Sequence, residues 1–388
     1  QSIEDVTAEV SAAVRPGQDA KEAYEARRGA IAEIQKRSHD ATGLRSDVVT
    51  LHRGGAYHLY CYKRYTDVRL VFAPDQQAAF FGGDPDNFSY PRYCYDLCFF
   101  RAYEDGAPAR TPQFLKWNAE GPAEGELIFV SGHPGHTNRS NTVAELQAAR
   151  EFELPYSLRR AYRTEVAIAA WARRDLENQR RAQGLLFGVQ NGRKARRAAL
   201  DGLLDPEFMR RKLRAETEFR MKLREQPGGA EADRAFDRIA QATEDYRKEF
   251  LRHQLLEGGD AFNSTFFGIA RTLLRAASET PKPNGERLEE FQDERRPTLE
   301  LRLFSPKPIY RDLEQVKLAD SLTFLQVMLG TSDPFVQEIM AGKSPQARAR
   351  ELVQGTGLQD PALRRALYDG GEGAVAKSAD PMICLLYT

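Results

Sequence analysis

The sequence predicts a multi-domain α and β protein, in which an antiparallel β region precedes a large helical region. The chain has 388 residues, enough for roughly two or three domains. Short segments rich in β-branched and aromatic residues lie between positions 47 and 135. After Asn141, apolar residues recur at the three-to-four spacing of a helix over most of the remaining chain. We therefore expect a β domain at 1–145 and an α-helical domain at 146–388.

The β domain opens with a charged helical pattern at 19–41. The segments 47–52 and 56–65 then read as two strands, because the first is rich in β-branched residues and the second in aromatic residues. The sequence Arg-Gly-Gly at 53–55 lies between them and predicts a hairpin turn. A third strand is expected at 67–72, where the sequence is DVRLVF.

A crowded loop follows at 81–96, with the sequence FGGDPDNFSYPRYCYD. Its Gly, Pro, Asp and Asn residues all weaken regular structure. Further strands are expected at 96–103 and 125–135, so that residues 47–135 form one antiparallel β unit. Loops held by a β scaffold often carry function. The alternative is that this loop is only a well-packed turn.

The helical region shows two apolar stripes that we expect to pack in the interior. Leu158, Tyr162 and Val166 form the first stripe, at i+4 spacing. The second stripe consists of Phe236, Ile239, Thr243, Tyr246 and Phe250. A Pro- and Gly-containing loop at 279–286 and a helix at 311–329 complete the expected elements.

The charge balance argues against a nucleic-acid partner, and the distribution of apolar residues argues against a membrane partner. Lys+Arg and Asp+Glu are both 56, so the formal net charge is zero, whereas a nucleic-acid-binding protein usually carries a basic excess. The sequence contains no apolar run long enough to span a membrane. We expect neither a nucleic-acid nor a membrane partner.

Metal and nucleophile motifs are weak. Asp84 to Asn87 resembles the start of a calcium loop, but Phe88 and Ser89 stand where that loop needs an oxygen ligand and glycine. His133 and His136 flank a Pro-Gly turn, which does not place both imidazoles on one helical face.

Ser131 is two residues from His133, but neighbours on an extended segment sit too far apart for proton transfer. We predict no metal site and no cofactor.

Several segments together resemble a known family. They are FGGDPDNFSYPRYCYD followed by FFRAYEDGAPA, SIEDVT at 2–7, YTDVRLVFAP at 65–74, VSGHPGHTNR at 130–139, LFSPKPIYRDLE at 303–314, KLADSL at 317–322 and GKSPQARARELVQGTGL at 342–358. In their order and spacing they are similar to the bacterial dipeptidyl-peptidase 7 and 11 family, serine peptidase family 46. The resemblance covers essentially the whole chain.

The resemblance implies a serine exopeptidase that releases dipeptides from the free N-terminus of peptides. It implies a fold in which residues 1–145 are part of a chymotrypsin-like antiparallel double β-barrel and the α-helical domain is a large insertion. Members of the family are typically periplasmic homodimers that need no cofactor, and we carry these properties over as expectations.

Four residues match functional positions of the family. Asp96 matches the catalytic Asp, which accepts the ring N–H of the catalytic His. Asn87 matches the residue that holds the substrate's α-ammonium, and an amide oxygen can accept from that group. Phe88 stands where many members have Trp, and Asn191 matches a second amine ligand in the helical domain.

The family's catalytic His and Ser motifs have no counterpart here, since neither the six histidines nor the serines stand in the required contexts. We expect an internal fragment that carries one triad residue and is inactive alone, because triad members act as a unit. The alternative is a non-catalytic remnant that binds peptide N-termini without cleaving them.

Overall fold

The computed structural model describes residues 1–130, 132 and 138–387. Contacts divide the chain into two compact units. The first combines residues 1–64, 167–182 and 254–388, and the second combines residues 65–166 and 183–253. Each unit contains one small β-sheet and several helices. The domain boundary expected after residue 145 stays a prediction.

The sheet of the first unit contains the predicted hairpin. The strands β1 (Ser2–Asp5), β2 (Arg45–Leu51) and β3 (Ala56–Tyr62) are antiparallel in the order β1-β3-β2. The turn between β2 and β3 is a short 3₁₀ segment, His52–Gly54, in which Gly54 has a φ of 95°. That left-handed conformation favours glycine, which explains the Arg-Gly-Gly signal.

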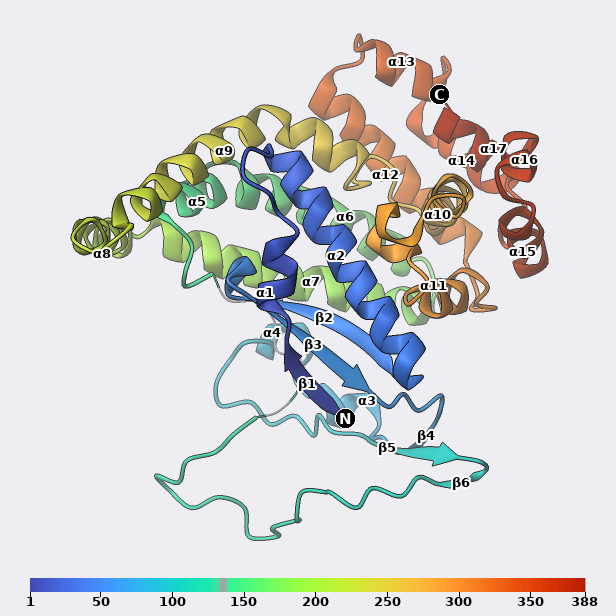
Figure 1. Ribbon diagram of the computed structural model, residues 1–388. Helices are drawn as coiled ribbons and strands as arrows, with labels where there is room; N and C mark the ends of the chain where they lie inside the picture. The colour runs from blue at the N-terminus through green and yellow to red at the C-terminus, as the bar shows by residue number, and fades with distance from the viewer. Residues whose placement is uncertain (131, 133–137, 388) are drawn as a thin grey trace. The chain divides into compact units, whose positions relative to one another are not determined.

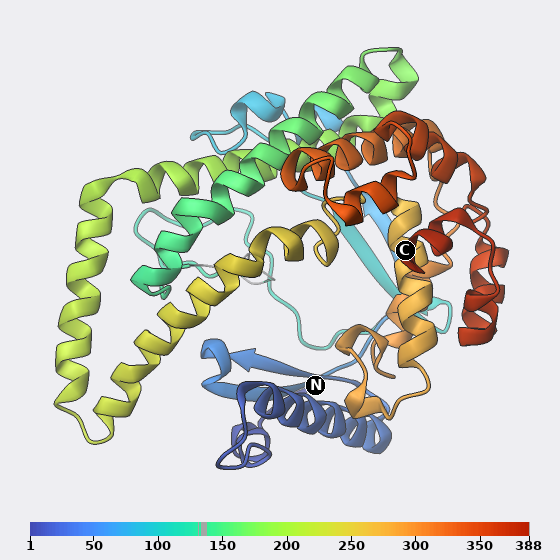
Figure 2. The same cartoon turned by 90° about the horizontal axis from the view of Figure 1, so that it is seen from above.

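Two helices, α1 (Thr7–Ala12) and α2 (Ala20–Thr42), lie on one face of this sheet (Figures 1 and 2). The N-terminus of α2 has a capping box, because Asp19 accepts from the backbone N–H of Glu22 and Glu22 accepts from that of Asp19. The core between helices and sheet is built from Val6, Val10, Ile34, Tyr57, Leu59 and Cys61.

The rest of the first unit is helical, from orange to red in Figure 1. Its helices are α10 (Thr265–Glu279), α11 (Arg296–Leu303), α12 (Arg311–Leu329), α13 (Pro334–Met340), α14 (Pro345–Gly355), α15 (Pro361–Asp369), α16 (Gly371–Ala376) and α17 (Pro381–Cys384), with 3₁₀ turns at Asn284–Glu286, Glu289–Phe291 and Leu385–Tyr387. The predicted loop at 279–286 and the helix at 311–329 are both confirmed.

The second unit contains a smaller sheet and the long helices. Its strands β4 (Asp67–Phe72), β5 (Phe99–Glu104) and β6 (Ala107–Pro108) are antiparallel in that order. The helices are α3 (Gln76–Ala79), α4 (Gly83–Asp86), α5 (Val143–Ala148), α8 (Pro206–Arg224) and the larger parts of α6 (Leu154–Ala172), α7 (Leu176–Leu204) and α9 (Gly229–Leu256), with a π-helical stretch at Ala149–Glu153. The end of α6, the start of α7 and the end of α9 belong to the first unit. Figure 2 shows α8 and α9 joined by a tight turn.

The apolar stripes are only partly buried. On α6, Leu158 is 6% exposed, but Tyr162 and Val166 are 45% and 68% exposed. On α9, Phe250 is 7% exposed and packs edge-on against Tyr156 and Tyr246. The expectation that both stripes form interior surface is therefore wrong at Tyr162 and Val166, and also at Tyr246, which is 38% exposed.

Two β predictions need correction. The single antiparallel unit expected at 47–135 is divided between the two sheets, because β4 pairs with β5 and not with β3. The strand expected at 125–135 is absent from the described part, residues 125–130. An apolar run becomes a strand only when it finds a partner to satisfy its backbone groups. Neither sheet closes into a barrel within the described residues, and the double β-barrel stays a prediction.

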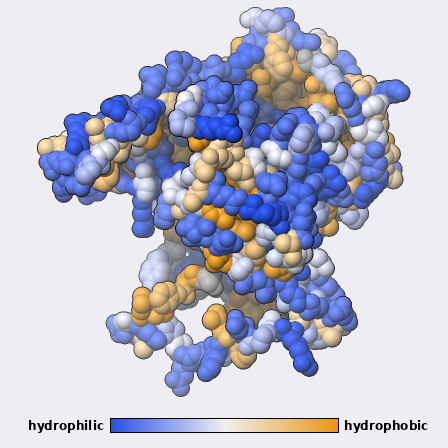
Figure 3. Space-filling model, in the orientation of Figure 1, coloured by the Kyte–Doolittle hydropathy of each residue, from blue (hydrophilic) through white to orange (hydrophobic). Residues whose placement is uncertain are grey.

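Residues 109–130 form an extended segment along the lower edge of Figure 1, and apolar atoms alternate with polar ones along it in Figure 3. Leu127, Phe129 and Val130 are 77%, 88% and 93% exposed. Among the residues that the structure describes, no helix has the length and apolar character needed to cross a membrane.

Candidate functional site

Two of the predicted site residues meet in the second unit. Asn87 follows α4 at the point where the backbone turns extended, with φ −63° and ψ 129°, and it is half-buried. Its Nδ2 donates a hydrogen bond of 3.0 Å to Oδ1 of Asn191 on α7. The structure thus brings together the two residues that the family resemblance assigns to one ligand.

Arg92 determines how these two amides are oriented. Its Nη1 donates to Oδ1 of Asn87 at 3.2 Å. A guanidinium offers only donors, so the Asn87 atom that faces it must be the oxygen, and the nitrogen is then left to face Asn191. Each of the two Oδ1 atoms keeps a second lone pair. The arrangement can therefore accept from a further donor, such as an ammonium group.

Aromatic packing holds this loop on α7. The rings of Phe80 and Phe187 are 4.7 Å apart, and Phe187 lies one helical turn before Asn191. The Arg92 guanidinium covers the same Phe80 ring at 4.9 Å from its centroid. Arg92 thus touches both the apolar contact and Asn87. Sequence reasoning did not single out Arg92, although it lies within the crowded loop.

Phe88 adopts a strained backbone conformation next to the pair. Its φ is 68°, in the left-handed region that a bulky residue rarely occupies, and its side chain is 64% exposed. Strain of this kind persists only where neighbouring contacts impose it. Here Asn87, the residue before Phe88, is held by its hydrogen bonds to Asn191 and Arg92. The substrate-contacting role expected for Phe88 stays a prediction.

Asp96 lies in an irregular, exposed segment just before β5. The segment is anchored on both sides, because the Tyr95 N–H donates to the Ala78 carbonyl at 2.9 Å and Phe99 pairs with Phe72. Asp96 itself makes no hydrogen bond or ion pair within the described part of the chain. The structure does not link it to Asn87 or Asn191, and its catalytic role stays a prediction.

A charged cluster flanks the amide pair. Asp84 Oδ1 lies 3.4 Å from Lys194 Nζ on α7. Arg193 Nε lies 2.5 Å from Glu165 Oε2 on α6, and Gln190 donates to Oε1 of the same glutamate at 3.2 Å. Burial lowers the pKa of Arg193, but the hydrogen bond and charge of Glu165 outweigh it, so that the pKa lies above its ordinary value.

The sequence does contain a signal for this cluster. Gln190, Asn191, Arg193 and Lys194 are spaced by three and four residues, which places polar groups on neighbouring faces of α7. The carboxylate of Asp84, weighed above as a calcium ligand, contacts Lys194. No group of three or more metal-ligating side chains occurs among the described residues. Ser131, His133 and His136 lie outside those residues.

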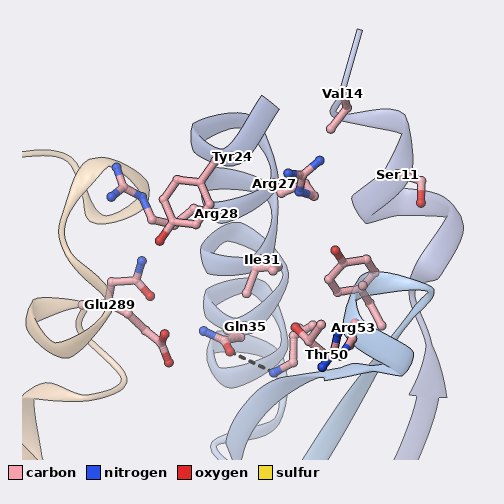
Figure 4. Close-up of a pocket in the computed structure, with 14 residues that line it drawn as sticks. Ser11, Val14, Tyr24, Arg27, Arg28, Ile31, Gln35, Thr50, Arg53 and Glu289 are labelled. Atoms are coloured by element: carbon pink, nitrogen blue, oxygen red, sulfur yellow. Dashed lines mark hydrogen bonds between the residues drawn. The ribbon is translucent and has the colours of Figure 1, made fainter. Parts of the chain in front are cut away.

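The first unit contains a cavity of about 700 Å³ between α1, α2, the β2–β3 turn and the 3₁₀ turn at Glu289–Phe291. Arg27, Arg28 and Arg53 are among its lining residues, and Glu289 also lines it. Figure 4 shows Gln35 at its base, where the amide oxygen accepts from the Val48 N–H at 2.8 Å. None of the predicted site residues lines it.

Comparisons with known proteins place the chain in one group. Residues 1–388 match the sequence model of the family described as Peptidase S46. The Asp/Glu-specific dipeptidyl-peptidase of Shewanella putrefaciens is 27% identical over 362 residues, which cover 88% of this chain and 48% of that protein. Dipeptidyl-peptidase 7 of Capnocytophaga gingivalis is 29% identical over 148 residues, covering 35% of this chain and 21% of that protein.

The fold is similar to that of a solved peptidase structure. Crystalline DPP11 of Porphyromonas endodontalis, in complex with the dipeptide Arg-Glu, has a TM-score of 0.68 and 20% sequence identity, and the match covers the whole of this chain and 58% of that one. The chain thus spans about half the length of the relatives that it matches over most of its own length.

Proposed function

Because the chain belongs to the peptidase S46 family, we propose that it forms part of a serine exopeptidase that releases dipeptides from the free N-terminus of peptides. The named functions of its relatives support this reaction, since they are dipeptidyl-peptidases. The dipeptide complex of the structural relative supports a peptide as the ligand.

The observation that carries the proposal is the contact between Asn87 and Asn191 at 3.0 Å. In the proposed complex, the substrate's α-ammonium donates to Oδ1 of both residues. Two amides supply acceptors without adding a second buried charge, and a hydrogen bond to a charged group contributes about 1.5–3 kcal/mol. Phe88 provides the ring beside the amine, where its 64% exposed side chain leaves a face for the substrate.

Asp96 has the remaining role in this proposal. Its carboxylate accepts the ring N–H of a histidine, fixes the tautomer and stabilises the imidazolium that forms during acyl transfer. The histidine and the serine nucleophile are supplied from outside the 388 residues, so this chain binds peptide N-termini but does not hydrolyse them alone. The strands belong to a chymotrypsin-like double β-barrel into which the helical region is inserted.

The same family membership supports further parts of the proposal. The whole enzyme acts in the periplasm, and it is a homodimer that works without a cofactor. Peptides with a free N-terminus are its binding partners.

The test compares one short peptide with a free and with an acetylated N-terminus. A fluorophore at the C-terminus reports binding to the chain through its anisotropy. We expect the free peptide to bind at least about tenfold more tightly, the equivalent of 1.4 kcal/mol, because acetylation removes the ammonium. Equal affinities would overturn the amine-binding proposal.

A second measurement separates binding from catalysis. Incubation of the chain with peptides that carry acidic or hydrophobic second residues, followed by mass spectrometry, detects any released dipeptide. Binding without release is the expected result. Release of dipeptides by the isolated chain would contradict the proposed need for an external histidine and serine.

A further inference from the structure

The turn that carries Asn87 and the helix that carries Asn191 are joined a second time, through charge. Lys194 lies three residues after Asn191 on α7, and its ammonium donates to the backbone carbonyl of Asp84 and, at 3.5 Å, to that of Pro85. It also lies 3.4 Å from Oδ1 of the Asp84 side chain. One ammonium therefore contacts three oxygens of the four-residue helix α4, which ends immediately before Asn87.

These contacts are shielded from water. The side chains of Asp84 and Lys194 are 19% and 24% exposed. Asp84 Oδ1 is buried and has no hydrogen-bond partner within the described residues, so Lys194 is the nearest group that offsets its charge. The other oxygen, Oδ2, lies 3.9 Å from Nη2 of Arg193. A buried carboxylate depends strongly on the cations beside it, and Lys194 is the nearer of these two.

The neighbouring residues make the helical side of this contact rigid. Arg193 is held by Glu165 at 2.5 Å and lies over the Tyr162 ring at 5.2 Å, and both partners come from α6. Through Arg193, the part of α7 that carries Asn191 and Lys194 is thus held against α6. Lys194 therefore links this fixed helix to the short turn that carries Asn87, in addition to the packing of Phe80 on Phe187, and can help to set the distance between the two amide side chains.

On this basis we propose that Lys194 and Asp84 are positioning residues, which hold the Asn87 turn against α7 and so keep the two amides at the spacing that an ammonium requires. The inference rests on the proposed amine-binding function. Neither residue contacts the substrate in this scheme. Their contribution is to remove the freedom of the turn before binding, which is how preorganised sites gain affinity.

The test uses the variants Lys194→Met, Lys194→Arg and Arg197→Met in the whole chain. Methionine keeps the stem of lysine but removes the charge, and arginine restores a cation. Arg197→Met is the matched control, because Arg197 lies on the same helix and is 58% exposed, with Asp201 as its ion-pair partner. All three are compared with the native chain for binding of free and acetylated peptide.

We expect Lys194→Met to reduce the preference for the free peptide about tenfold, while Lys194→Arg restores most of it and Arg197→Met leaves it unchanged. In the background of Asn191→Ala, Lys194→Met adds no further loss, because it acts through the amide pair. A native preference in Lys194→Met, or independent losses in the double variant, would overturn the positioning role while leaving the amine site standing.

A second measurement does not depend on peptide binding. Hydrogen exchange of the unliganded chain, followed by mass spectrometry, reports the mobility of residues 76–92. Lys194→Met is expected to speed exchange in that segment and not in α9, whereas Arg197→Met changes neither. Unchanged exchange in Lys194→Met would sink the inference. A native chain that fails to distinguish the two peptides would refute the proposed function instead.

Discussion

Asn87 and Asn191 lie 104 residues apart in the chain, and their side-chain amides form a hydrogen bond of 3.0 Å. The two residues come from a turn and from the middle of a long helix, so neither local structure predicts the contact. Both amides are neutral, and the one full charge that contacts them among the described residues is the Arg92 guanidinium on Asn87, which does not attract an ammonium. Such a pair binds an amine by hydrogen bonding and orientation more than by charge attraction.

The first prediction concerns the two amides. Asn87→Ala and Asn191→Ala should each weaken binding of the free peptide about tenfold, since each removes one acceptor for the ammonium. The double variant should lose less than the sum, because the two side chains contact each other. Anisotropy titrations measure this. Asn118→Ala is the control, since Asn118 hydrogen-bonds with Glu120 and Gly121 of its own loop, and a loss there equal to the others would refute the assignment.

The second prediction concerns Asp96, to which the proposal gives a role in catalysis and none in binding or stability. Because Asp96 is exposed and makes no hydrogen bond or ion pair within the described residues, Asp96→Asn should change the free energy of unfolding by less than about 0.5 kcal/mol. Peptide affinity should also be unchanged. Urea unfolding measures the stability of the variant, and peptide anisotropy measures its affinity. A marked loss of stability would show that Asp96 has a structural role that the present contacts do not explain.

Local signals account for the elements that the sequence predicted correctly. The helix α2 begins at a capping box of Asp19 and Glu22 and ends at Gly43, whose φ is 66°. The hairpin of β2 and β3 turns at Gly54, which has a positive φ. Both depend on residues a few positions apart, so a single sequence is enough to identify them.

The parts that sequence reasoning missed depend on long-range partners. The pairing of β4 with β5 joins Asp67 to Tyr103, and apolar alternation alone does not identify a partner strand. The apolar run at 125–130 resembles a strand but pairs with none in the described chain. At the site, the contacts of Arg92 and Lys194 join a loop to a helix, and only the folded chain shows which polar residues meet.

The third prediction is a pH dependence at the turn between α8 and α9. Hydrogen bonds from Arg220 and Arg224 lower the pKa of Asp233 from 3.8 to about 2. A lowered pKa means that the folded state binds the proton less well than the unfolded state does. The stabilisation is therefore complete above pH 3.8 and is lost as the pH falls towards 2.

Urea unfolding of the native chain and of Asp233→Asn measures this effect. The free energy of unfolding of the native chain should exceed that of Asp233→Asn by a constant amount near neutral pH, and this difference should shrink across the acidic range. In Arg220→Gln the difference should depend less on pH, because the hydrogen bond from Arg220 is the largest cause of the lowered pKa of Asp233. A difference that does not depend on pH would contradict the assignment.

The fourth prediction concerns a buried guanidinium in the first unit. Arg364 is 2% exposed and donates to the carbonyls of Leu358, Leu303, Ser305 and Gln359 at 2.6–3.1 Å. Burial lowers its pKa, and the carbonyls hold the charge in place. Arg364→Met should lower the free energy of unfolding by about 3 kcal/mol or more, since several buried acceptors lose their donor.

The neighbouring Arg365 is the matched control for this experiment. It is 51% exposed and lies over the Phe304 ring at 3.7 Å. Arg365→Met should lower the free energy of unfolding by about 1 kcal/mol at most, because exposed cation–π contacts and ion pairs are weak. Similar losses for both variants would mean that the carbonyl network around Arg364 does not support the fold.

The last prediction follows from the exposed apolar run at 127–130, where Leu127, Phe129 and Val130 are at least 77% exposed. An unpaired, uncharged apolar segment offers its backbone and side chains to other chains, which favours aggregation. Phe129→Lys should slow the rise of light scattering at high protein concentration, because a charge interrupts the run. Leu204→Lys is the control, since Leu204 is also exposed, at 59%, but lies at the end of α7 outside any such run. Equal slowing by both variants would show that added charge alone explains the effect.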